Sequence, residues 1–86
     1  MAHFKYFATA NDDEAVAGPV RLCGVVVGTG AASAVFTVYN GTTTSDPVVA
    51  AFDATVENTY EFHGVILSNL YAKLTGGNAL VTLIYE

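Results

Sequence analysis

Positive charge is scarce in this 86-residue chain, because Lys5, Arg21 and Lys73 are its only lysine and arginine residues. Nucleic-acid binding needs clustered cations that neutralise phosphates, and three scattered ones beside a net charge of −5 argue against it. The same shortage argues against an anionic membrane surface. No uninterrupted apolar stretch approaches the roughly 20 residues of a membrane-spanning helix. We therefore expect neither nucleic acid nor a membrane as a partner.

Residues that carry catalysis are also few. Cys23 is the only cysteine, so no disulfide can form within the chain. It lies in the apolar run 20–28 and is interpreted as a small buried hydrophobic residue. General bases by residue type are limited to His3 and His63. The chain contains no Gly-x-Ser-x-Gly, His-Glu-x-x-His or Cys-x-x-Cys sequence. We expect no enzymatic activity and no cofactor.

A metal site is a weaker alternative that two polar groups leave open. On a strand, Glu61 and His63 would point to the same side, about 7 Å apart. Asp12, Asp13 and Glu14 form an acidic cluster that calcium could use, although they lack the alternating spacing of an EF-hand loop. We favour a surface histidine and a solvated acidic loop, and ion binding at the acidic cluster stays open.

Charged residues make up 13% of the chain, about half the usual share of roughly 25%. Hydrophobic residues make up 52%. A domain this small has a large surface for its volume and should need more polar residues, not fewer. This composition predicts that part of the surface faces other protein subunits.

Short segments rich in β-branched and aromatic residues, separated by glycine, asparagine and proline, run along the whole chain. No segment has a helical apolar period. The sequence predicts an all-β protein, a small antiparallel β-sandwich (jelly-roll-like) of seven or eight short strands. The predicted strands cover residues 3–8, 20–27, 34–40, 48–52, 59–63, 69–74 and 79–85, and residues 65–67 are expected as a further strand or an irregular segment.

Residues 1–86 are predicted to form one domain. Residues 10–17 read as a polar loop, and 28–30 and 76–78 as hairpin turns. The segment 1–17 is acidic and loop-rich, and we consider it as an N-terminal arm that docks on a neighbour. Its first seven residues hold one lysine and lack the apolar run of a signal peptide.

In the last predicted hairpin, the strand 79–85 is largely apolar on both faces, whereas a strand solvated on one side should alternate. The run Val25-Val26-Val27 has the same property. We predict that one face of these strands fills the core and that the other face binds a neighbouring subunit. The predicted assembly interface comprises Tyr71, Leu80, Thr82, Ile84, Val25 and Val27.

Three stretches carry a family resemblance: Arg-Leu-Cys-Gly-Val-Val-Val at 21–27, Val-Tyr-Asn-Gly-Thr-Thr-Thr at 38–44, and Leu-Tyr-Ala-Lys-Leu-Thr-Gly at 70–76, which leads to Val-Thr-Leu-Ile-Tyr-Glu at 81–86. From residue 20 onward, about three quarters of the chain, the sequence resembles small virion structural proteins of tailed bacteriophages, in particular jelly-roll capsid decoration (cement) or fibre-associated proteins.

The resemblance implies a two-sheet sandwich attached to a capsid or tail, often as a symmetric oligomer, with trimers common. We therefore expect a non-enzymatic decoration protein that is made in the host cytoplasm and resides in the virion. Its expected partners are its own copies and the major capsid protein or other virion proteins. Oligomer number, head or tail location and the docking protein stay open.

A receptor- or glycan-binding module of a tail fibre is the alternative. Sugar platforms usually present exposed aromatic faces, often tryptophan, and this chain has no tryptophan. Its candidate substitutes are Tyr39, Tyr60, Tyr71 and Tyr85. Tyrosine at a strand end is more often a core-edge residue whose hydroxyl reaches water, so the assembly function is the one we favour.

Overall fold

The computed structural model describes residues 3–86, apart from the side chain of His63, and all the regular elements in this range are strands. They pair antiparallel in the order β1-β6-β2-β5-β3-β4. The predicted all-β, sandwich-like fold class is confirmed. The strands are β1 (His3–Phe7), β2 (Asp13–Thr29), β3 (Val35–Asn40), β4 (Val48–Asp53), β5 (Asn58–Thr75) and β6 (Leu80–Tyr85).

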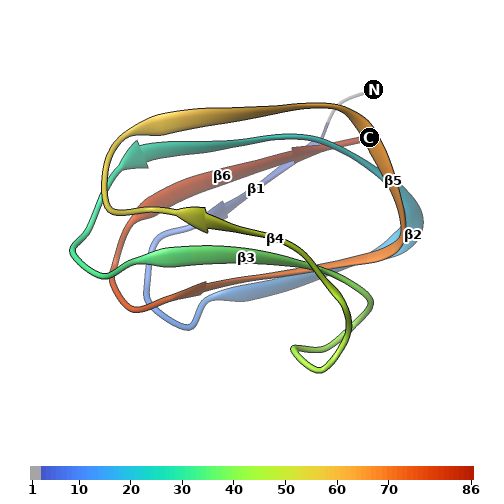
Figure 1. Ribbon diagram of the computed structural model, residues 1–86, viewed down its shortest axis with the longest axis horizontal. Coiled ribbons are helices and arrows are strands. Elements are labelled where there is room, and N and C mark those ends of the chain that lie inside the picture. The colour runs from blue at the N-terminus through green and yellow to red at the C-terminus, as the bar shows by residue number, and fades with distance from the viewer. Residues whose placement is uncertain (1–2) are drawn as a thin grey trace.

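Two long strands, β2 and β5, build both layers of the sandwich. They pair along almost their whole length, and together they turn from the upper layer to the lower one in Figure 1. Sheet I consists of β1, β6, the C-terminal half of β2 and the N-terminal half of β5. Sheet II consists of the N-terminal half of β2, the C-terminal half of β5, β3 and β4.

The bend in β2 and β5 coincides with irregular pairing. Between the pairs Ala17–Asn69 and Val20–Leu67, β2 carries one residue more than β5, and the register shifts again nearer Gly24. Extra residues of this kind bend a strand and increase its twist. Gly18 passes so close to Ser68 that a Cβ atom would lie 1.9 Å from the Ser68 carbonyl oxygen. Only glycine allows this close approach, so the bend depends on it.

The bend also explains where the predicted strands differ from the observed ones. The first part of β2 was expected as a loop that ends at Gly18-Pro19, and β5 was expected as separate segments over 59–63, 65–67 and 69–74, because Gly64 resembles a break. The predicted hairpin turns at 28–30 and 76–78 are wrong, because the strands that they connect do not pair with each other. The turn at 28–30 connects β2 to β3, which pairs with β5, and the turn at 76–78 connects β5 to β6, which pairs with β1 and β2. Both turns carry the chain from one layer to the other.

Residues 3–17, which the sequence analysis considers as part of an arm, are largely paired within the sheet of the same chain. Residues 3–7 pair with β6, and residues 13–17 pair with β5. The loop predicted over 10–17 is therefore wrong from Asp13 onward. Docking of this segment on a neighbour stays a prediction, and residues 1–2 lie outside the described part.

The core joins the two layers through aromatic and aliphatic side chains. Phe7 of β1 meets Phe36 of β3 edge to face, with ring centroids 4.7 Å apart. Phe52 of β4 meets Phe62 of β5 in the same way at 5.6 Å. Aromatic pairs of this geometry stabilise a core beyond their burial alone. Among the described residues, no polar or charged side chain is buried. The fully buried large side chains are Phe7, Phe36, Leu22, Leu70, Leu74, Leu83, Val25, Val27, Val38 and Val81.

Leu83 and Leu80 provide a matched test of this core, because both belong to β6 but face opposite sides. Leu83 is fully buried, whereas Leu80 is 52% exposed. We expect Leu83→Ala to lower the free energy of unfolding by about 2–5 kcal/mol through lost contacts and a cavity. Leu80→Ala should change it by about 0.5 kcal/mol. Urea denaturation at low protein concentration measures both, and equal losses would contradict the assigned faces.

Candidate interaction surfaces

The outer side of sheet I carries exposed hydrophobic side chains from three neighbouring strands. Tyr6 is 73% exposed, Phe4 60% and Leu80 52%. The rings of Phe4 and Tyr6 contact each other, with centroids 5.9 Å apart. Ile84 and Val26 lie beside them and are half-buried. We call this surface the apolar face; it comprises Phe4, Tyr6, Val26, Leu80, Thr82 and Ile84.

Strand register aligns these residues in two rows across sheet I. Phe4 lies opposite Ile84, and Ile84 lies opposite Gly24. Tyr6 lies opposite Thr82, which in turn lies opposite Val26. Cross-strand neighbours on one face are close enough to form a continuous surface. The two rows therefore make one patch without a charged side chain, and Glu61 on β5 and Glu86 after β6 flank it.

The edge strand β1 places its only lysine on the other side. Lys5 lies between Phe4 and Tyr6 in sequence, so its side chain leaves the opposite face of the strand. It pairs in register with the buried Leu83 and is itself half-buried. A charge that points inward on an edge strand discourages pairing with a further strand.

The predicted assembly residues divide between three places. Leu80, Thr82 and Ile84 lie on the apolar face, as expected for an interface. Val25 and Val27 are 0% and 2% exposed and belong to the core, so their inclusion was wrong. Alternation places Val26, not its neighbours, on the outside.

Tyr71, the remaining predicted residue, lies on sheet II, where it is half-buried on the outer side. Phe4, Tyr6 and Val26, which the structure places on the apolar face, were not among the predicted residues. The alternation of Phe4-Lys5-Tyr6-Phe7 was the available signal, but it does not indicate which side of the strand packs on the core.

A second surface, on the outer side of sheet II, centres on two tyrosines. Tyr39 of β3 and Tyr71 of β5 are register partners, and their ring centroids lie 5.7 Å apart at an interplanar angle of 46°. The Tyr71 hydroxyl donates a hydrogen bond to Asp13 Oδ2 at 2.5 Å. In the strand register, Lys73 of β5 lies opposite Asp13 of β2 on one side and opposite Thr37 of β3 on the other. We call Asp13, Thr37, Tyr39, Tyr71 and Lys73 the tyrosine face.

The other two tyrosine candidates serve the sandwich itself. Tyr60 packs on Phe52 with centroids 4.9 Å apart, and its hydroxyl donates to the Asp53 carbonyl oxygen at 3.1 Å. Tyr85 stacks on His3 at 5.5 Å. Both are half-buried beside the core.

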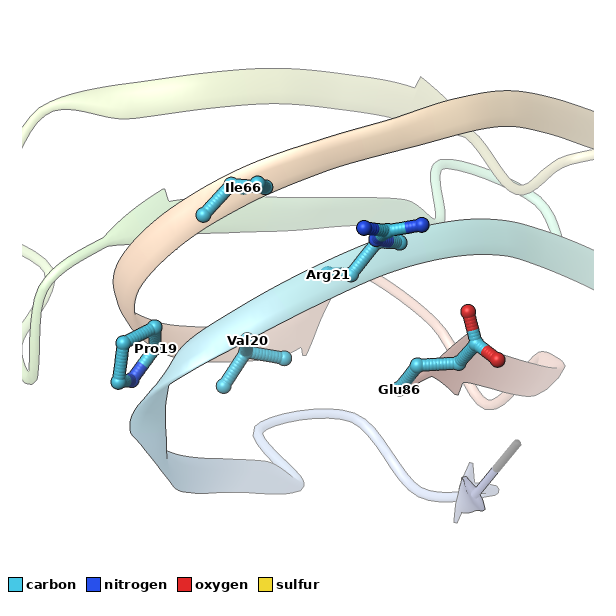
Figure 2. Close-up of a pocket in the computed structure, with 5 residues that line it drawn as sticks. All are labelled: Pro19, Val20, Arg21, Ile66 and Glu86. Carbon is cyan, nitrogen blue, oxygen red and sulfur yellow. The ribbon is translucent and has the colours of Figure 1, made fainter. Parts of the chain in front are cut away.

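A hollow of about 450 Å³ lies at the bend of β2 and β5. Figure 2 shows Pro19, Val20 and Ile66 along it, with Arg21 and Glu86 toward one end. The Arg21 and Glu86 backbones exchange hydrogen bonds of 2.9 and 2.8 Å, which extend the β2–β6 pairing. None of the five lining residues is a nucleophile with an adjacent base, so this hollow has no arrangement for covalent catalysis.

Cys23 lies near this end of the molecule but is not the fully buried residue expected. It is half-buried at the bulge in β2, and its Sγ lies 3.8 Å from Glu86 Oε1. Burial and then the neighbouring Glu86 carboxylate raise the pKa of the Cys23 thiol. A raised pKa disfavours the thiolate, so this position does not suit a nucleophile.

Several carboxylates are occupied as hydrogen-bond acceptors in turns. Asp12 accepts from the backbone N–H groups of Ala8 and Thr9 at 3.1 and 2.9 Å. Asp46 accepts from the N–H groups of Thr42 and Thr43 at 2.7 and 2.9 Å, and these bonds lower its pKa. Such contacts stabilise short loops because they satisfy backbone donors.

The acidic cluster does not converge on one point. Asp12 closes a turn, Asp13 accepts from Tyr71 on the outer face, and Glu14 follows on the other side of β2. Within residues 3–86, no group of three or more His, Cys, Asp and Glu residues could hold a metal ion. The predicted pair of Glu61 with His63 involves a side chain outside the described part.

Comparison with known proteins does not assign the chain to a family, because no protein-family model and no curated protein matches its sequence. In the part of the chain that the structure covers, there is no helix long and apolar enough to cross a membrane. The two outer faces of the sandwich are therefore the features on which a function can be argued.

The hydrogen bond between Tyr71 and Asp13 can be measured directly. Asp13 raises the pKa of Tyr71 to about 12, because the carboxylate accepts from the neutral phenol and repels the phenolate. The bond stabilises the fold below the ordinary tyrosine pKa of about 10, and this contribution is lost as pH rises through about 12. Asp13→Asn should move one tyrosine to a lower pKa in an ultraviolet absorbance titration. Asp12→Asn is the control, and equal titrations of the two variants would contradict the contact.

Proposed function

We propose that this chain is a non-enzymatic structural protein that oligomerises and binds other subunits through its apolar face. The observation that carries the proposal is the pair of register rows on sheet I. There, the exposed residues Phe4, Tyr6 and Leu80 adjoin Ile84 and Val26 without an intervening charge. Large exposed apolar patches on small proteins mark interaction sites.

Energetics supports the same conclusion. Covering apolar surface contributes about 25 cal/mol per Å², and a chain of this size has a thin stability margin alone. The chain has no disulfide available, since Cys23 is its only cysteine. Oligomerisation is then a direct way to add stability, because a second protein removes the remaining apolar side chains from water.

Within this proposal, the setting is the virion of a tailed bacteriophage, and the role is capsid decoration. The resemblance of residues 20–86 to small virion structural proteins supports it, and the sandwich-like fold agrees with that resemblance. Decoration uses many identical copies, so weak contacts act together through multivalency. A net charge of −5 suits an outer position, away from the packaged DNA. A symmetric trimer is the oligomer that the resemblance favours.

The double variant Leu80→Lys, Ile84→Lys tests the apolar face. Two charges in this patch would have to be desolvated on assembly, so we expect a smaller mass by multi-angle light scattering at equal concentration. Circular dichroism should stay unchanged, because neither side chain is in the core.

The matched control is Val48→Lys, Val56→Lys. Both valines are 58% exposed but lie outside the apolar face, in β4 and in the loop between β4 and β5. The control should keep the native mass. A native protein that is monomeric at high concentration, or a Leu80/Ile84 variant that keeps the full mass, would refute assembly through this face.

Attachment to a capsid needs its own experiment. Purified protein should co-sediment with capsids of the phage that encodes it, and saturate at a fixed copy number. Phe4→Thr, Tyr6→Thr removes two exposed rings while keeping residues that favour strands. We expect at least tenfold weaker capsid binding by this variant. Failure of the native protein to co-sediment would reject decoration and leave self-assembly to be judged by the mass measurement.

A further inference from the structure

The tyrosine face differs in chemistry from the apolar face on the opposite side of the sandwich. Tyr39 and Tyr71 present adjacent rings, and polar side chains stand beside them on the same side of sheet II. Asp13 accepts from the Tyr71 hydroxyl, and Lys73 lies between Asp13 and Thr37 in register. The surface therefore combines two adjacent, mutually tilted aromatic rings with hydrogen-bonding groups along one side.

The two tyrosines are half-buried, and their neighbours along the other side are small. Ala15 lies opposite Tyr71 on β2, and Ala17 lies opposite Asn69 in the adjacent position. Neither alanine can cover a ring. Neither tyrosine belongs to the buried core, whereas Tyr60 and Tyr85 pack against it. Packing of the sandwich therefore does not account for the position of this pair.

We propose that the tyrosine face binds a neutral carbohydrate, with one pyranose ring stacked on Tyr39 and Tyr71. A pyranose has an apolar face of C–H groups and a rim of hydroxyls, which matches aromatic rings flanked by a carboxylate, an ammonium and a hydroxyl. Asp13 uses Oδ2 for Tyr71, and its second oxygen can accept from a sugar hydroxyl.

Charge selects among carbohydrates. The chain carries a net charge of −5, and Asp13 stands beside the rings. Like charges repel, so sialylated and other acidic glycans are disfavoured even with Lys73 nearby. Neutral hexose and N-acetylhexosamine glycans are the expected ligands.

A tyrosine that only packs on its neighbour would not need a fixed hydroxyl. The Tyr71 hydroxyl has a hydrogen-bond partner, Asp13, within the protein itself, and this bond favours one orientation of the ring. Preorganisation of this kind lowers the entropy lost on binding. Asp13 is thus a positioning residue for the platform as well as a polar contact.

A printed glycan array with neutral and sialylated members tests the inference, followed by calorimetric titration of the strongest neutral oligosaccharide. We expect neutral glycans to bind. Tyr39→Ala and Tyr71→Ala should each weaken binding at least tenfold, and Tyr71→Phe, which keeps the ring but loses the bond to Asp13, should weaken it less.

Amide shifts of the native protein, followed by nuclear magnetic resonance during the same titration, provide a test that does not rely on folded variants. The shifts should centre on β3 and on the C-terminal half of β5. The Leu80→Lys, Ile84→Lys variant should keep sugar binding, so failure of this inference is distinguishable from failure of assembly.

Three results would overturn it: no neutral glycan binds, the shifts map to another surface, or folded alanine variants bind as the native protein does. A change of oligomer mass in Tyr39→Ala or Tyr71→Ala would instead assign the tyrosine face to a protein interface, which also rejects the sugar site.

Discussion

The continuous pairing of β2 with β5 through the bend is the constraint on which the rest of the molecule depends. Each strand supplies hydrogen-bond partners to both layers, so β6 and β3 can join opposite sheets only because this ladder passes between them. Gly18 permits the close approach to Ser68 at the bend. Without the bend, the rings of Phe7 and Phe36, which belong to different sheets, would not be brought together.

The same ladder separates two chemistries. Strand alternation directs Val25, Val27 and Leu70 into the core, while Val26 and Tyr71 leave it in opposite directions. One outer side is then apolar and free of charge over two rows, and the other carries an ordered tyrosine pair with polar neighbours. The proposed protein contact and the proposed sugar site therefore lie on opposite outer sides of the sandwich.

Local pattern predicted much of the fold but little of its connectivity. The strands at 35–40, 48–53 and 80–85 were expected within a residue, since turn residues flank them. The partners of β6 could not be read from Gly76-Gly77-Asn78, because a glycine turn looks alike whether it closes a hairpin or crosses between layers. Alternation identified the outward set Leu80, Thr82 and Ile84. It failed for Val25 and Val27, where three consecutive valines give no sign of which one faces outward.

Lys5 has a consequence for the kind of assembly this chain can enter. An edge strand without such a charge could add strands from successive copies and grow into an open-ended fibre. With Lys5 on the inner side of the strand, opposite Leu83 in register, β1 resists that lateral extension. The opposite edge of the sheet is β4, which has no lysine, so this protection is confined to one of the two edges.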